Sequence, residues 1–152
     1  MAKSTTQVWD KLVRRLKVMK NKPHVRVGIF GDATKAAAHE YGAPGAGIPE
    51  RSFIRLTFIK QEQEQKRLTA KLLNQVVEKG MEVPKVLALL GTWGAAQVKA
   101  TITKGPQSEW PELSEPYGTD KAERGKTKML VDTGEMVNSI TYQVKLIDDN
   151  AD

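Results

Sequence analysis

One stretch near the C-terminus decides the fold: Met129-Leu130-Val131-Asp132-Thr133-Gly134-Glu135-Met136-Val137-Asn138-Ser139-Ile140. Asp132 followed three residues later by Glu135 has the spacing of a capping box, so a short helix of about two turns is predicted to start here. After this helix, apolar and polar residues alternate from Ile140 to Leu146. The alternation indicates a strand with one face on a core and the other toward water.

A long segment, residues 105–128, precedes this stretch. It holds three of the chain's seven prolines, the aromatic residues Trp110 and Tyr117, and a charged tip. Connections of this length without secondary structure are uncommon inside compact domains and usually bind something. We therefore expect a small scaffold that presents a long arm.

Length and composition limit the class of protein. The 152 residues suit one domain, residues 1–152, with a modest core. The absence of cysteine excludes disulfides and thiolate zinc sites. No run of eighteen apolar residues occurs, and Met1 to Asp10 is too polar for a signal peptide. We expect a soluble protein made in a cytoplasm, with no membrane partner.

The net charge of +6 raises the alternative of a small basic nucleic-acid-binding protein. Much of the excess gathers at residues 11–22, whereas most other basic residues alternate with acids. No aromatic residues are interleaved as in a known binding motif, so a solvated helix face explains the cluster more simply.

The N-terminal segment, residues 1–22, is predicted to be an amphipathic helix. Val8, Leu12 and Leu16 lie four residues apart and form an apolar stripe with a basic back. The alternative is a basic helix that lies on a membrane or on an acidic partner. Pro23 ends the helix, because the residue before a proline disfavours helical angles.

Next, the alternation in residues 24–30 predicts a strand, and Asp32 is placed to cap a helix over residues 33–41. Gly42 suits the left-handed position that ends this helix. Residues 43–49 are rich in glycine and proline and are expected to form a flexible loop.

Two long helices follow in the pattern. The first is predicted from Phe53 or Ile54 to Lys79, and its middle, residues 60–67, has no apolar residue. The second runs from Pro84 to Thr103, with two glycines at positions expected to lie where two helices cross. The fold class predicted is α+β: a small antiparallel sheet packed against two long antiparallel helices, with a long Pro-rich arm.

Candidate catalytic and metal-binding groups are few. His39-Glu40 starts like a zinc-protease helix, but position 43 is Ala43 rather than a second histidine. The five serines lie outside any nucleophile-elbow pattern. Eighteen acids allow many carboxylate pairs, and nothing singles one out. We expect no catalytic residue, no cofactor and no metal, and hence no enzyme.

Three ordered segments resemble the neck and tail-completion proteins of tailed bacteriophages, which include virion morphogenesis and head–tail joining proteins. They are residues 27–30 with 36–42, residues 48–55, and residues 111–114 with Thr119, Lys121, 130–134 and 139–142. The resemblance covers roughly residues 24 to 146. Ser52 departs from it, because a second proline is expected there.

This resemblance implies a structural virion protein in the neck or tail. Such proteins look like subunits of a ring, commonly six-fold and sometimes twelve-fold, that completes or terminates the tail. The ring docks on the head connector and on the tail tube or tail terminator, and it leaves a channel through which DNA passes without sequence-specific contacts.

Candidate interface residues follow from the arm and from the second segment of the resemblance. We expect subunit contacts at Trp110, Leu113, Tyr117, Arg51 and Phe53, since aromatic residues and arginine dominate interface energetics. The alternative is a Pro-rich loop tucked against its own subunit. The structural motif residues are Gly42, Asp132, Thr133, Gly134 and Glu135.

Overall fold

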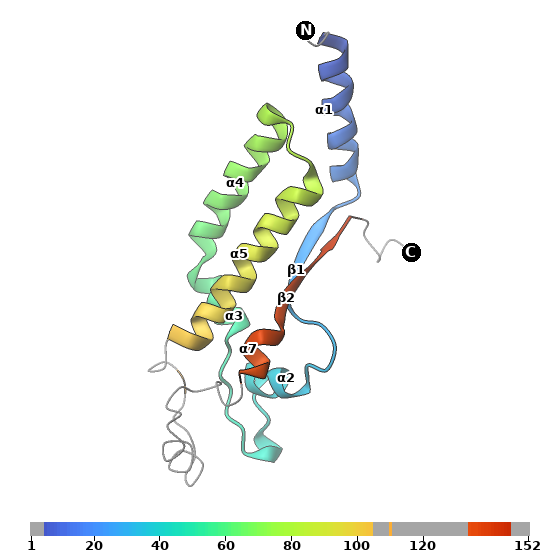
Figure 1. The fold of residues 1–152 in the computed structure, drawn as a ribbon. Coiled ribbons are helices and arrows are strands. Elements are labelled where there is room, and N and C mark those ends of the chain that lie inside the picture. Colours follow the sequence, from blue (N-terminus) through green and yellow to red (C-terminus); the bar gives the residue numbers. More distant parts are fainter. Residues whose placement is uncertain (1–4, 105–109, 111–133, 147–152) are drawn as a thin grey trace.

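The computed structural model describes residues 5–104, Trp110 and residues 134–146. The elements are α1 (Thr5–Lys20), β1 (His24–Ile29), α2 (Thr34–Tyr41), η1 (Pro44–Ala46), α3 (Ile54–Lys60), α4 (Glu62–Lys79), α5 (Val83–Lys104), α7 (Glu135–Ser139) and β2 (Ile140–Lys145). Figure 1 shows α4 and α5 as an antiparallel hairpin beside the two strands. Helix α1 projects beyond one end of this body, and α2, α3 and α7 gather at the other. The predicted α+β fold class is confirmed.

The sheet pairs the two predicted strands in antiparallel fashion. Val25 lies opposite Val144, and Val27 lies opposite Tyr142, so the apolar residues of both strands share one face. That face packs on α5, whereas Arg26, Thr141 and Gln143 on the other face are exposed. The alternation therefore fixes the register of the two strands, because a slip by one residue would turn the apolar side chains of one strand toward water.

Helix α5 approaches the sheet closely at two glycines. A Cβ atom at Gly91 would overlap the ring of Tyr142 and come within 2.8 Å of a Val25 methyl group. At Gly94 it would come within 3.0 Å of a Val27 methyl group. These glycines were predicted to lie where two helices cross, which is wrong for Gly91, whereas a Cβ at Gly94 would also meet Phe58 of α3 at 3.5 Å. They form a notch in α5 that receives the two strands.

The long helix predicted from residue 53 to 79 is two helices, α3 and α4, which meet at Gln61. The break falls where the apolar pattern lapses, so no side-chain packing holds the two helices in line. The start of α4 instead carries exposed ion pairs, Glu62 with Lys66 and Glu64 with Arg67. The hydrogen bond from Lys66 lowers the pKa of Glu62.

Two apolar clusters divide the core along α5. The first cluster contains Ala36, Phe53, Ala95, Val98, Ile102, Trp110 and Ile140. The second contains Leu72, Val76, Val83, Val86 and Leu87. Helix α3 packs on the first cluster and α4 contributes to the second, which explains why the two helices separate. Helix α5 supplies buried residues to both clusters, and β1 and β2 also pack on both, so these three elements join the two halves of the core.

Helix α7 forms where predicted, but its cap differs from the prediction. Its N-cap is Gly134, with φ +79°, and Glu135 is its first residue. Glu135 therefore does not occupy the third helical position that a capping box requires. Asp132 and Thr133 lie outside the described residues. A glycine suits this site because its left-handed angle costs other residues strain.

The segment from Asp32 to Ile48 is more ordered than its composition suggested. Thr34 donates to Asp32 Oδ1 from its hydroxyl at 2.7 Å and its N–H at 3.1 Å, which lowers the pKa of Asp32. Gly42 follows α2 with φ +76°, and a Cβ there would meet the Glu50 nitrogen at 3.1 Å. The expected flexible loop contains η1 and a bridge between Ala43 and Ile48.

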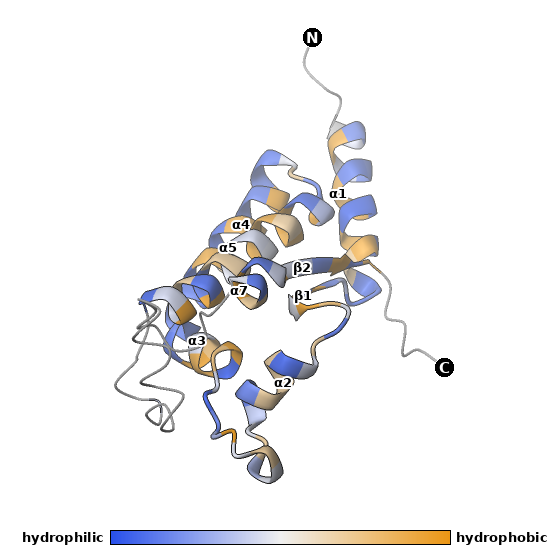
Figure 2. Ribbon diagram, turned by 60° about the horizontal axis from the view of Figure 1, so that its bottom comes forward, coloured by the Kyte–Doolittle hydropathy of each residue, from blue (hydrophilic) through white to orange (hydrophobic). Residues whose placement is uncertain are grey.

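Helix α1 has the predicted stripe, but the body covers little of it. Val8, Trp9 and Leu16 are 54%, 64% and 50% exposed. In Figure 2, hydrophobic and hydrophilic residues alternate around α1, and no other element lies over its N-terminal half. Near its C-terminal end, Val18 packs on the second core cluster. The helix is thus tethered at one end.

The glycine notch can be tested with Gly91→Ala. The added methyl group should lower the free energy of unfolding by about 1–3 kcal/mol through overpacking, although alanine is the better helix former. Urea unfolding measures the difference. Gly45→Ala is the control, because a Cβ there meets nothing within 4 Å. Equal stabilities of the two variants would contradict the notch.

Candidate functional site

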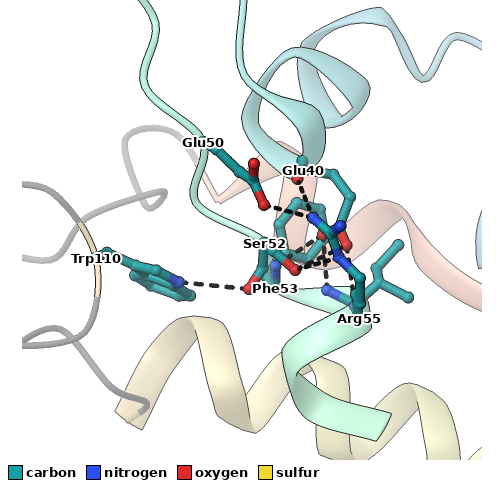
Figure 3. A network of polar contacts seen from close by, with 7 residues as sticks. Glu40, Glu50, Ser52, Phe53, Arg55 and Trp110 are labelled. Carbon is teal, nitrogen blue, oxygen red and sulfur yellow. Dashed lines mark hydrogen bonds and ion pairs between the residues drawn. The ribbon is translucent and has the colours of Figure 1, made fainter. Parts of the chain in front are cut away.

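A buried carboxylate, that of Glu40 in α2, organises the most polar site in the described structure (Figure 3). Glu40 is 5% exposed. Its Oε2 accepts hydrogen bonds from the backbone N–H groups of Phe53 at 2.7 Å and Ile54 at 2.8 Å. Its Oε1 accepts from the N–H of Arg55 at 2.9 Å and the hydroxyl of Ser52 at 3.1 Å. Both oxygens are therefore engaged.

These donors are the free N–H groups at the start of α3. A helix leaves its first four N–H groups without intrahelical partners, and a negative charge at this end also stabilises the helix dipole. Phe53, the N-cap residue of α3, has no side-chain oxygen to accept from them. Glu40, from another helix, performs this capping. The bond couples α2 to α3 across the intervening loop.

Arg55 closes the outer side of the same site. Its guanidinium donates to Glu50 Oε1 at 2.5 Å, to the Glu40 backbone carbonyl at 3.3 Å and to the Ser52 hydroxyl at 3.3 Å. It also lies 5.9 Å from the centre of the Tyr41 ring. The Arg55 side chain is half exposed, so the ion pair contributes less than the buried bonds of Glu40.

Three residues expected at a subunit interface lie inside their own chain. Phe53 is 0% exposed, Arg51 is 4% exposed and Trp110 is 6% exposed. Trp110 packs in the first core cluster, and its Nε1 donates to the Ser52 carbonyl at 3.4 Å (Figure 3). The expectation that these three side chains anchor a neighbouring subunit is therefore wrong. Phe53 and Trp110 instead pack with residues of α5 in the first core cluster.

The other predicted site residues fall into two groups. Leu113, Tyr117, Asp132 and Thr133 lie outside the described residues. Gly42 and Gly134 both adopt the positive φ angles that favour glycine.

An apolar groove runs between β1, α3, α4 and α5, with a volume of about 310 Å³. Its walls are Val25, Val27, Phe58, Leu90 and Trp93, with Gln65 and Thr69 as the polar members. None of these seven side chains carries a charge. The groove can accommodate apolar groups, but its walls supply no acid or base.

Within residues 5–104, Trp110 and 134–146, no group of three or more His, Asp and Glu side chains is arranged to hold a metal ion. In the same part of the chain, no helix has both the length and the apolar character needed to cross a bilayer.

Comparisons with known proteins add no relative to this picture. The sequence matches no protein-family model, and the searches of curated proteins and of solved structures gave no match.

The capping role of Glu40 was not predicted from the sequence. The sequence instead offers a local cap, because Ser52 is a residue type that favours the N-cap position, whereas in the structure Phe53 occupies that position and has no oxygen to accept from the free N–H groups. Nothing local to α3 points to the acid in α2, since the two are separated by the glycine-rich loop.

Glu40→Gln tests the distant cap. The amide would place its NH₂ group against backbone donors, so the free energy of unfolding should fall by about 2–4 kcal/mol. Glu50→Gln is the matched control, because Glu50 is exposed and its ion pair is worth no more than about 1 kcal/mol. Chemical denaturation of both variants decides the point, and an equal loss in the two would refute the cap.

Trp110→Ala tests the placement of Trp110 in the core. Truncation of this buried ring should cost about 3–5 kcal/mol of unfolding free energy. In the monomeric protein, Trp9→Ala should cost less than about 1 kcal/mol, because Trp9 is 64% exposed. Thermal and urea unfolding give both values. A Trp110→Ala variant with a nearly unchanged free energy of unfolding would contradict the buried position of Trp110.

Proposed function

We propose that this protein is a structural subunit of a ring at the head–tail junction of a tailed bacteriophage. In this role it completes or terminates the tail, docks it on the head connector and leaves a channel for DNA. The six-fold ring is favoured over the twelve-fold one. The protein then resides in the neck or tail of the virion after synthesis in the host cytoplasm.

One observation carries the proposal: the described parts of the segments behind the resemblance to neck and tail-completion proteins form a single connected unit. Residues 27–29 of the first segment pair with residues 140–142 of the third. Glu40, also in the first segment, caps the helix that starts in the second. Segments that meet in this way support a shared structural framework rather than an accidental similarity of short motifs.

The chemistry of this unit suits a structural role. The Glu40 carboxylate is surrounded by backbone N–H donors and the Ser52 hydroxyl, so its oxygens are used to join helices. A proton acceptor for catalysis needs access to a substrate. The proposal therefore includes no reaction and no cofactor.

The buried positions of Arg51, Phe53 and Trp110 limit how such a ring can form. Contacts between subunits must use surfaces that the body leaves exposed. Helix α1 provides one such surface, and the partners above and below the ring would be tail tube or tail terminator proteins and head-connector proteins.

Native mass spectrometry and negative-stain microscopy of the purified protein test this function. We expect rings with one fixed subunit number, six in the favoured case, and density for the same ring in the connector region of assembled particles. A strictly monomeric protein that is also missing from that region of the particle would refute the proposal.

A second candidate, a small basic nucleic-acid-binding protein, is favoured by the exposed bases of α1, among them Lys11, Arg14, Lys17 and Lys20. Filter binding over a range of salt concentrations separates the two functions. A site-specific complex that survives physiological salt supports the second candidate, whereas weak binding that salt abolishes fits DNA passing through a channel.

A further inference from the structure

Helix α1 carries an exposed surface that is both apolar and basic. Its exposed apolar side chains are Val8, Trp9, Leu16 and Met19. Its sixteen residues contain five basic residues and one acid, Asp10. Four of these bases are exposed, as noted above. A partner for this surface should therefore supply apolar side chains together with negative charge.

The body holds α1 by its C-terminal half. Val18 packs on the second core cluster, and Arg15 Nε lies 3.8 Å from Glu82 Oε1. The Arg15 guanidinium also lies against Gly80, at the turn between α4 and α5. Isolated helices of this length are marginal in water. The N-terminal half of α1, which the body does not cover, would therefore be stabilised by packing against a partner.

The chain itself contains a segment of the complementary kind. Residues 109–120 include four acids and no base: Glu109, Glu112, Glu115 and Asp120. Leu113 and Tyr117 lie between these acids and add apolar area. Opposite charge and apolar content thus match the exposed surface of α1.

The starting point of this acidic segment is far from α1 of the same chain. Trp110 belongs to the same cluster as Ile102 of α5, whereas α1 reaches the other cluster, with Leu87 of α5, through Val18. The stretch of α5 from Leu87 to Ile102 is about 22 Å long. The two attachment points therefore lie toward opposite ends of α5.

The number of residues between Trp110 and the acids then decides whether these acids can contact α1 of their own copy. Trp9 lies about 14 Å beyond Val18, along the direction in which α1 leaves the body (Figure 1). Glu115 can extend no more than about 18 Å from Trp110. Glu112 is closer still to that fixed point. Glu112 and Glu115 therefore cannot meet the N-terminal half of their own α1, and their contact with this surface has to involve a neighbouring copy.

We propose that the acidic segment, residues 109–120, of one copy docks on the exposed apolar and basic surface of α1 of the next copy. The contact is heterologous, because each copy gives one surface and receives the other, and such contacts generate closed rings. The inference rests on the proposed ring function and names the surfaces that join its subunits.

Two charge-reversal variants test the contact in the full-length protein. The first carries Lys11→Glu, Arg14→Glu and Lys17→Glu. The second carries Glu109→Lys, Glu112→Lys and Glu115→Lys. Each variant alone should assemble at least tenfold more weakly than the wild type, because both surfaces then have the same sign. An equimolar mixture of the two should recover assembly, with the two variants alternating around the ring.

Native mass spectrometry at about 0.1 M and about 1 M salt provides the readout, since high salt screens charge contacts and should reduce the differences. The control is Lys71→Glu, Lys79→Glu and Lys85→Glu, which makes the same charge change on α4 and α5 and should assemble as the wild type does. Circular dichroism and urea unfolding check that every variant is folded. Variants that fail this check are replaced by Lys11→Gln with Lys17→Gln, for which a smaller loss of assembly is expected.

Three results would overturn the inference while leaving the ring function intact: rings formed by either reversal variant alone, no recovery in the mixture, or an equal loss in the α4 and α5 control. Binding of the wild type to vesicles of anionic phospholipid that prevents assembly and is lost in the first variant would assign the α1 surface to a membrane instead. If the wild type forms no ring, the proposed function itself fails.

Discussion

The structure depends on a carboxylate that replaces a missing helix cap. Glu40 stands at the end of α2 and accepts the free N–H groups of α3, a helix whose own N-cap residue cannot accept them. Because a buried charge is costly unless it is hydrogen-bonded, the position of Glu40 fixes the position of α3, and the reverse is also true. Phe53 and Trp110 then fill the first core cluster beneath this joint.

The second constraint is steric. Helix α5 passes through both core clusters, and its notch at Gly91 and Gly94 lets two strands lie against the helix backbone. These two features act at different places along α5. The hydrogen bonds of Glu40 hold α2 and α3 together near the C-terminal part of α5, and the glycine notch holds the sheet against its middle. Helix α1 lies outside both and is attached at one end, which leaves its apolar and basic surface exposed.

Sequence patterns predicted the local features of this fold. Periodicity identified both strands and the N-terminal and fifth helices, and glycine chemistry identified the end of α4 at Gly80, where φ is +72°. The patterns failed where a residue's role depends on a distant partner. Glu40 looked like an ordinary helix residue, and Trp110 looked like an exposed anchor. The break at Gln61 was missed because propensity permits a continuous helix there, while packing on two separate clusters does not.

The pairing of His24 with Lys145 has a consequence for how the protein is made. Strand β1 is synthesised before α2, α3, α4 and α5, and its hydrogen-bonding partner β2 is synthesised after them. Until then, no β2 residue packs against the notch in α5, and β1 has no neighbouring strand with which to form hydrogen bonds. Such non-local pairing slows folding and leaves strand edges open to wrong partners. The sheet can therefore close only after β2 has been synthesised.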